Sequence, residues 1–206
     1  MDSSQAIGLL SLSLALAWAS GINVYATILM LGILGSTGNL DLPPRLMILT
    51  HPAVIAAAGF MYLVEFFADK IPGVDSGWDA LHTFIRIPAG AILAAAIFGE
   101  MNPALVLSAA ILGGVLSAGS HAAKAGSRLM INTSPEPFTN WTASVFEDVL
   151  VIAGLWMAIQ HPYLFLLFLA GFIALIIYLI PKLWRGIKRL FTTIARFFGK
   201  NGPRTA

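Results

Sequence analysis

The chain has 206 residues, of which 58% are hydrophobic and 11% are charged, and it contains no cysteine. Soluble domains carry about 25% charged residues. This composition, with a mean hydropathy of +0.83, excludes a water-soluble or a disordered protein. It predicts an all-α, polytopic membrane bundle, because apolar stretches of this length are buried only in a bilayer. The absence of cysteine excludes disulfides, zinc–thiolate sites, iron–sulfur clusters and thiol catalysis.

Charge is distributed unevenly along the chain. Seven of the twelve Lys and Arg residues follow Pro181 without an accompanying acid, whereas residues 3–181 hold nine acids and five bases. Basic segments beside membrane spans stay in the cytoplasm. We therefore expect a multi-pass protein of the cell inner membrane with a cytoplasmic C-terminus. Residues 1–5 contain no Lys or Arg, so we expect no cleaved signal peptide.

The first half of the chain begins with an apolar block that is too long for one straight crossing. As a single helix it measures about 45 Å, against about 30 Å for the hydrocarbon core. Gly21 and Asn23 favour non-helical backbone near its middle, so we expect a kink or a re-entrant turn there. In chain order we expect an apolar block over 6–35 broken at 20–25, a loop over 36–52, a span over 52–71, a short polar helix over 75–86, and an apolar piece over 88–99 that is too short to span alone.

The second half follows a similar order. Residues 117–121 are small and polar and lie in the middle of a second long block, so we expect a second break there. The matching order favours an internal two-fold repeat of residues 1–100 and 101–181, as in many secondary transporters. Shared small-residue composition would produce the same likeness without a repeat. In chain order we expect a block over 104–130, a loop over 132–140, and spans over 141–160 and 162–180.

Ionisable residues within these spans form the candidate site. A charge at the bilayer centre costs at least about 2.5–3.5 kcal/mol, so such residues usually face water, a counter-charge or an ion. We expect the acids of the span over 52–71 to meet the bases of the block over 104–130, or the acids of the span over 141–160. The alternatives are interfacial side chains and structural salt bridges. The candidate substrate-binding residues are Asn23, Glu65, Asp69, Lys70, His121, Lys124, Arg128, Glu147 and Asp148.

A second polar group recurs at helical spacing, at Asp75, Asp79, His82 and Arg86. Asp79 and His82 could ligate a metal, but such a pair is more often part of a solvated helix face, which is the interpretation favoured here. We therefore leave a metal site open, and we expect no cofactor. Because acids outnumber bases within the membrane domain, the excess favours a cationic ligand, a proton relay or carboxylates solvated in loops.

The segment after Pro181, residues 182–206, differs from the membrane domain over 1–181. Its apolar residues fall on one arc of a helix and its bases on the opposite arc, as in helices that lie on anionic lipid. We expect this helix to begin at Pro181. The partners expected are the bilayer and anionic lipid, with no nucleic acid and with a homo-oligomer left open. The residues expected at the membrane surface are Lys182, Trp184, Arg185, Lys188, Arg189 and Arg196.

Several short sequence elements occur together in a distinctive order. They are Gly21-Ile22-Asn23-Val24-Tyr25, Glu65-Phe66-Phe67-Ala68-Asp69-Lys70-Ile71-Pro72, His121-Ala122-Ala123-Lys124, Asn132-Thr133-Ser134-Pro135-Glu136-Pro137 and Glu147-Asp148. In these elements the chain resembles the bacterial integral membrane proteins grouped as a domain of unknown function, DUF4126. The resemblance extends to about Pro181. It implies a compact membrane fold and carries no activity with it.

The sequence favours a small membrane transporter or channel-like protein for a cation or a proton-coupled small solute. The intramembrane carboxylates would form its site, and Lys124 and Arg128 would act as switchable counter-charges. An anionic or zwitterionic substrate held by these two bases is an alternative. A non-transporting scaffold or lipid-organising protein, with the basic tail as its working part, is another. We do not expect an enzyme, because no nucleophile–base set is visible in the sequence.

Overall fold

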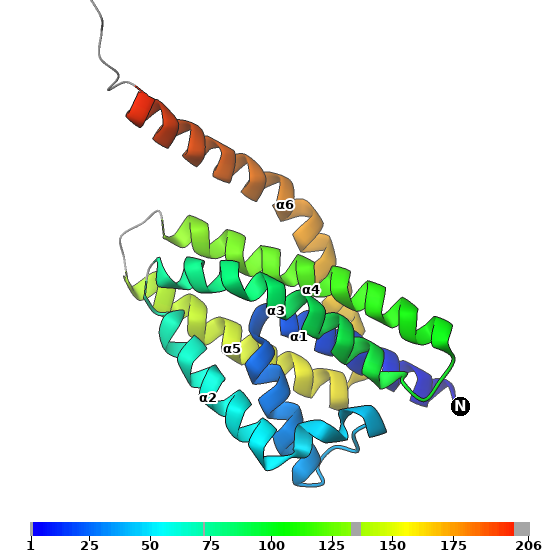
Figure 1. Ribbon diagram of the computed structural model, residues 1–206. Coiled ribbons are helices and arrows are strands. Elements are labelled where there is room, and N and C mark those ends of the chain that lie inside the picture. The colour runs from blue at the N-terminus through cyan, green and yellow to red at the C-terminus, as the bar shows by residue number, and fades with distance from the viewer. Residues whose placement is uncertain (1, 72, 133–136, 200–206) are drawn as a thin grey trace, which may run out of the picture.

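The computed structural model describes residues 2–71, 73–132 and 137–199, although most side chains beyond residue 182 lie outside this description. The described chain is a bundle of helices (Figure 1). Five of them are long and apolar enough to cross a membrane, and the bent pair of η1 and α2 would add a sixth. The predicted all-helical, multi-pass membrane fold is confirmed. The helices are α1 (Ser3–Ser36), the 3-10 helix η1 (Pro44–Thr50), α2 (Pro52–Ala68), α3 (Val74–Ile97), α4 (Pro103–Ile131), α5 (Pro137–Gln160) and α6 (Pro162–Gly199).

Helix α1 occupies the centre of the bundle and contacts every other helix (Figure 1). It is apolar on all sides and rich in Ala, Ser and Gly, which allow neighbouring backbones to approach closely. Serine hydroxyls fasten it to its neighbours. Ser11 donates to the carbonyl of Ala158 on α5 at 3.2 Å, and Ser13 donates to the carbonyl of Ala94 on α3 at 3.0 Å. Such bonds satisfy polar groups that cannot reach water inside a membrane.

The predicted break in α1 is confirmed. Asn23 has φ −149° and ψ 98°, so the helix is kinked at this residue. The Asn23 side-chain oxygen accepts a hydrogen bond from the backbone N–H of Ala26 at 2.9 Å, as in a helix N-cap. The Thr27 hydroxyl donates to the Asn23 carbonyl at 2.8 Å. Backbone groups released by the kink are therefore bonded by nearby side chains.

Three predicted boundaries were wrong. Helix α4 runs from Pro103 to Ile131 without a second break over 117–121, because its small residues serve close packing and leave the backbone regular. The internal repeat thus loses one of its two matching breaks and stays a prediction. Helix α3 continues through Pro88 as one 24-residue span, since neighbouring helices tolerate proline inside a membrane helix. Part of the expected loop over 36–52 is the helix η1.

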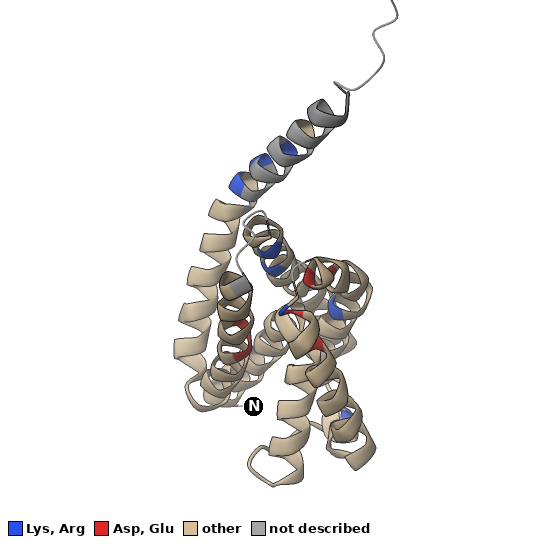
Figure 2. Cartoon of the chain, turned by 90° about the vertical axis from the view of Figure 1, so that its left-hand side faces the viewer, with Lys and Arg blue, Asp and Glu red and all other residues tan. Residues whose placement is uncertain are grey.

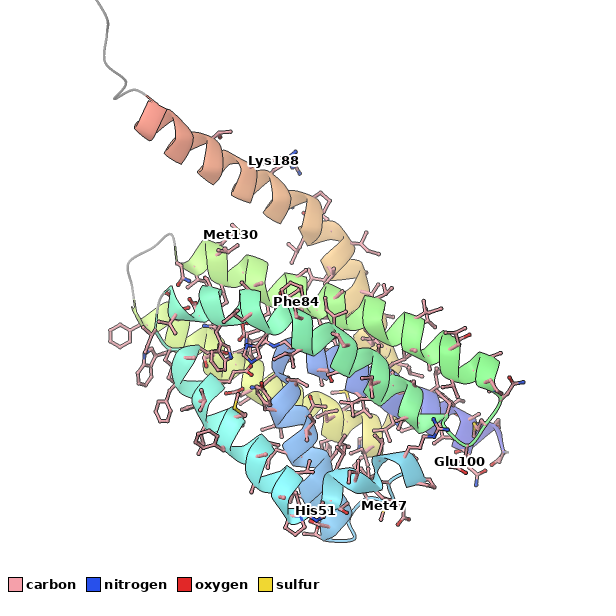
Figure 3. All side chains as sticks on the ribbon, viewed as in Figure 1. Met47, His51, Phe84, Glu100, Met130 and Lys188 are labelled. Carbon is pink, nitrogen blue, oxygen red and sulfur yellow. The ribbon has the colours of Figure 1, made fainter. Side chains whose placement is uncertain are left out.

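The C-terminal helix also differs from the prediction. Helix α6 is continuous through Pro181, so the tail continues a membrane span and does not begin a new helix. Its second part projects away from the bundle, with basic residues along it (Figures 1 and 2). Lys182, Arg185 and Lys188 are exposed, and Lys188 lies on this projecting part (Figure 3). The side chains of Trp184, Arg189 and Arg196, also expected at the membrane surface, lie outside the described residues.

The surface of the bundle is apolar and its interior contains the charges. Phe84, on the outer face of α3 (Figure 3), is 82% exposed, whereas Arg86 on the same helix is fully buried. Large apolar side chains are exposed on α2, α3, α4, α5 and α6. Such a surface is suited to contact with lipid hydrocarbon. Polar groups are costly in hydrocarbon, so they lie in the interior of the bundle.

The close contact of α1 with α4 at Gly21 gives a direct test of this packing. A Cβ atom at Gly21 would lie 2.0 Å from Ser120 Oγ and 2.3 Å from the Ser117 carbonyl oxygen, whereas a Cβ at Gly119 would meet no atom within 4 Å. We expect Gly21→Ala to lower the free energy of unfolding by about 1–3 kcal/mol through overpacking. Gly119→Ala, its matched control, should raise it slightly, because alanine is the better helix former. Unfolding in mixed detergent micelles measures the free energy of unfolding of both variants. Equal effects of the two substitutions would contradict the close contact between α1 and α4.

Candidate functional site

A group of seven ionisable side chains lies inside the bundle, where four helices meet. These residues, which we call the ionic cluster, come from α2 and its C-terminal end, α3, α4 and α5. Six of them are at most 5% exposed, and the side chain of Glu147 is 13% exposed. Figure 2 shows that charged residues occur on several neighbouring helices. The ionic cluster consists of Glu65, Asp69, Asp79, Arg86, Lys124, Arg128 and Glu147.

Arg86 joins α3 to α2. Its two terminal nitrogens form separate ion pairs, Nη2 with Glu65 Oε1 at 2.7 Å and Nη1 with Asp79 Oδ1 at 2.7 Å. Asp79 precedes Arg86 by seven residues, which places both on the same face of α3 two turns apart. All three side chains are at most 1% exposed. Arg86 therefore holds two carboxylates that have no access to solvent.

Lys124 on α4 lies among four carboxylates. Its ammonium nitrogen is 2.7 Å from Asp69, 3.4 Å from Glu65, 3.6 Å from Glu147 and 3.8 Å from Asp79. The same nitrogen donates to the carbonyl of Ile22 at 3.2 Å, beside the kink in α1. A lysine carries one compact charge on a flexible stem. Small movements of this stem would therefore exchange one carboxylate partner for another.

Arg128 closes the cluster on the side of α5. Its Nε and Nη2 atoms donate to the two carboxylate oxygens of Glu147 at 3.2 and 2.7 Å. Its Nη1 atom donates to the carbonyl of Asp69 and to two oxygens of Asn140, each at 3.0 Å. The sequence prediction that Glu65 or Asp69 meets Lys124 or Arg128 is thus confirmed. The interfacial alternative for Arg128 was wrong, because this side chain is fully buried.

The cluster carries more carboxylates than bases. Four carboxylates and three basic groups give a formal charge of −1 when all are ionised. Glu65 Oε2, Asp69 Oδ1 and Asp79 Oδ2 are buried and have no hydrogen-bond partner among the described residues. Buried polar atoms are nearly always bonded, so unbonded ones call for an explanation. A bound proton or small cation would supply both the missing charge and the missing partner.

His121 extends the polar interior from the ionic cluster toward Thr83. Arg86 Nη1 lies 3.1 Å from His121 Nδ1, and a guanidinium can only donate, so Nδ1 accepts this bond. His121 Nε2 lies 2.7 Å from the Thr83 hydroxyl, which itself donates to the Asp79 carbonyl at 3.1 Å. The consistent assignment is a neutral imidazole with its proton on Nε2. His121 thus acts as an acceptor for the cluster.

The adjacent acids Glu147 and Asp148 have different partners, as their positions on a helix require. Glu147 pairs with Arg128, whereas Asp148 Oδ1 accepts a bond from Asn23 Nδ2 at 3.0 Å. Asn23 therefore connects Asp148 to the kink in α1. Asp148 Oδ2 is buried without a hydrogen-bond partner among the described residues.

Lys70 stands apart from the ionic cluster, although the sequence grouped it with these residues. Its ammonium donates to the Phe66 carbonyl at 2.9 Å and to Ser144 at 3.4 Å, and it lies over the ring of Phe66. It forms no salt bridge with another described residue. Lys70 follows the end of α2, and desolvation by burial lowers the pKa of its ammonium. Its bonds are those of a residue that fixes the end of α2 against α5.

The polar stripe on α3 is buried, so its interpretation as a solvated face was wrong. Asp75, Asp79, His82 and Arg86 are at most 4% exposed. The candidate metal pair is separated by its bonding, since Asp79 pairs with Arg86 and His82 with Tyr25 at 3.0 Å. The described residues contain no group of three His, Cys, Asp or Glu side chains arranged to hold a metal ion. The stripe belongs to the bundle interior because the outer face of α3 is apolar.

Sequence reasoning therefore missed Arg86 and Asp79 as members of the site. It also missed a polar chain at one end of the cluster. Asn132 donates to both oxygens of Asp75 at 2.8 and 2.9 Å, and Asn140 donates to Asn132 at 2.9 Å. The helical spacing of the polar stripe on α3 was the sequence signal that could have identified Asp79 and Arg86. No sequence signal pairs Asp75 with Asn132, since the two lie 57 residues apart.

Comparison with known protein families gives a match over most of the chain. The family described as a domain of unknown function, DUF4126, matches residues 10–182, which include every helix that contributes to the ionic cluster. No curated protein and no solved structure matches the chain. The extent of the family match agrees with the resemblance noted in the sequence. The chain belongs to the DUF4126 family.

Proposed function

We propose that this protein is a small integral membrane transporter or channel-like protein for a cation or a proton-coupled small solute. The observation that supports the proposal best is the buried ionic cluster, with its formal charge of −1 and three carboxylate oxygens that have no hydrogen-bond partner among the described residues. Ionisable residues inside membrane domains are costly and mark ion or proton pathways. The inner membrane is the proposed location, with the basic C-terminus in the cytoplasm and in contact with anionic lipid.

Lys124 is the proposed moving part. Asp69 is its nearest carboxylate, at 2.7 Å, and Glu65 and Glu147 lie at 3.4 and 3.6 Å. A cation that reaches Asp69 would weaken this ion pair and leave the ammonium to Glu65 and Glu147, and release of the cation would return the ammonium to Asp69. Because Lys124 also donates to the Ile22 carbonyl, this exchange acts on the kink of α1. Cation binding is thereby coupled to a backbone position on the central helix.

A charge-displacement measurement tests the proposal. Purified protein in liposomes is adsorbed on a solid-supported membrane, and a step in pH should give a transient current that empty liposomes lack. Asp69→Asn and Lys124→Met should each reduce the displaced charge at least fivefold, because they remove the nearest carboxylate partner of Lys124 and the moving counter-charge itself. Glu100→Gln, in the exposed turn between α3 and α4 (Figure 3), is the matched control. Currents that are absent from the parent chain, or unchanged in both variants, would refute the proposal.

A scaffold or lipid-organising role is the second candidate. It is favoured by the projecting part of α6, whose described bases Lys182, Arg185 and Lys188 are all exposed. The projecting helix extends beyond the bundle (Figure 1), where it can lie against lipid or another protein. Absence of pH-induced current together with vesicle clustering by the intact chain would favour this role.

A further inference from the structure

A groove of about 310 Å³ lies between α4, α5 and α6, and one side of the ionic cluster forms its floor. Its walls are mainly apolar and include Ile22, Ala143, Phe146, Leu150 and Phe172. Phe146 is 63% exposed, so the groove opens on the outer, apolar surface of the bundle. A ligand would therefore enter from the hydrocarbon and must itself be largely apolar.

The polar lining of the groove includes one ammonium and one carboxylate. Lys124 and Glu147 both line it, but the Lys124 side chain is 2% exposed and the Glu147 side chain is 13% exposed. The carboxylate is thus the more accessible of the two charges. Ser120 and Ser127 also line the groove, and their hydroxyls donate to the backbone carbonyls of Trp18 and Lys124. Behind Glu147 the ionic cluster carries its formal charge of −1.

We propose that this groove binds a lipophilic cation, such as a quaternary onium ion or a protonated hydrophobic amine. The charged centre would lie against Glu147, and the apolar substituents would contact the groove walls. The aromatic faces of Phe146 and Phe172 add cation–π attraction. The inference rests on the proposed function and names the substrate class for it. A cation that pairs with Glu147 competes with Arg128 and Lys124 for this carboxylate, which links ligand binding to the exchange of carboxylate partners at Lys124.

Two probes of nearly identical shape and opposite charge test the charge preference. Tetraphenylphosphonium and tetraphenylborate are titrated into the intact protein in an uncharged detergent, and binding is followed by isothermal titration calorimetry. We expect saturable binding of the cation, at least tenfold tighter than that of the anion, and weaker cation binding at low pH. Equal binding of both probes would overturn the proposal, because the groove would then be selecting only for hydrophobicity.

Variants separate the groove from the fold. Glu147→Gln should weaken phosphonium binding at least tenfold, and Ala143→Phe should do so by filling the groove without removing a charge. Val115→Phe is the matched control, since Val115 is 67% exposed on α4 and does not line the groove. Unchanged binding in Ala143→Phe would exclude this groove as the site. If phosphonium fails to bind but pH-induced currents persist, the substrate class is wrong and the proposed function stands. If phosphonium binds but no pH-induced current is measured, the substrate class of the groove stands and the proposed function is wrong.

Discussion

Replacement of Arg86 by methionine is expected to destabilise the protein by about 3–5 kcal/mol, because it leaves two buried carboxylates without their closest counter-charge. Glu65 and Asp79 each lie 2.7 Å from the guanidinium and are at most 1% exposed. Methionine fills most of the same volume, so the loss would be electrostatic rather than a loss of packing. The midpoint of unfolding in mixed dodecyl maltoside and dodecyl sulfate micelles measures the effect.

A compensating variant distinguishes charge from damage to the fold. Arg86→Met combined with Glu65→Gln and Asp79→Asn removes all three charges and should recover most of the lost stability, because replacing a complete buried ionic group is often close to neutral. Arg45→Met is the control, since Arg45 is exposed, and we expect it to change the free energy of unfolding by less than about 0.5 kcal/mol. A triple variant as unstable as Arg86→Met alone would contradict this account.

Trp18→Ala is expected to cost a similar amount, about 3–5 kcal/mol, for a different reason. Trp18 is fully buried on α1, and its ring lies edge-on to Phe165, Phe168 and Phe172 of α6, with centroid distances of 6.0, 5.4 and 5.8 Å. Its indole nitrogen has no hydrogen-bond partner among the described residues, so the loss would come from packing. Unfolding in the same mixed micelles measures it.

Two further variants define the Trp18 result. Trp18→Phe should lose less than about 1.5 kcal/mol, because most of the ring contacts remain. Trp156→Ala is the control, since Trp156 is 53% exposed on α5. If Trp18→Ala were no more destabilising than Trp156→Ala, the contact of α1 with α6 would not be a core of this fold.

Hydropathy predicted the membrane class and most of the spans, because apolar length is a direct requirement of the bilayer. The kink at Asn23 was predictable as well, since a Gly-Ile-Asn sequence in the middle of an overlong block breaks regular helix. The break expected in α4 was not found, because Ser117 bonds to α3 and Ser120 bonds to α1 without altering the backbone of α4. Small residues alone therefore do not distinguish a break from a contact.

The site was predictable only in part. The acids on α2 and the bases on α4 stood out because a charge within an apolar span has few explanations. Arg86 did not stand out, because it follows a polar stretch that is typical of a surface helix. The exposure of Leu81, Phe84 and Ile85 in the structure shows that the apolar face of α3 points outward and the polar stripe inward. The hydropathy of a helix face depends on what surrounds it. In a membrane protein the polar face turns inward, the reverse of a soluble bundle.

The kink in α1 places two helix ends inside the bundle. The first half of the helix ends at Ile22, and its carbonyl end is equivalent to about half a negative elementary charge; the second half starts after Asn23, and its amide end is equivalent to about half a positive one. The Lys124 ammonium meets the carbonyl end at 3.2 Å, and Asp148 is bonded to Asn23 at the amide end. These partial charges belong to peptide dipoles that no change of pH can neutralise. An ion or proton that reaches the cluster would thus encounter a permanent local field, whose direction changes only when the two halves of α1 rotate against each other.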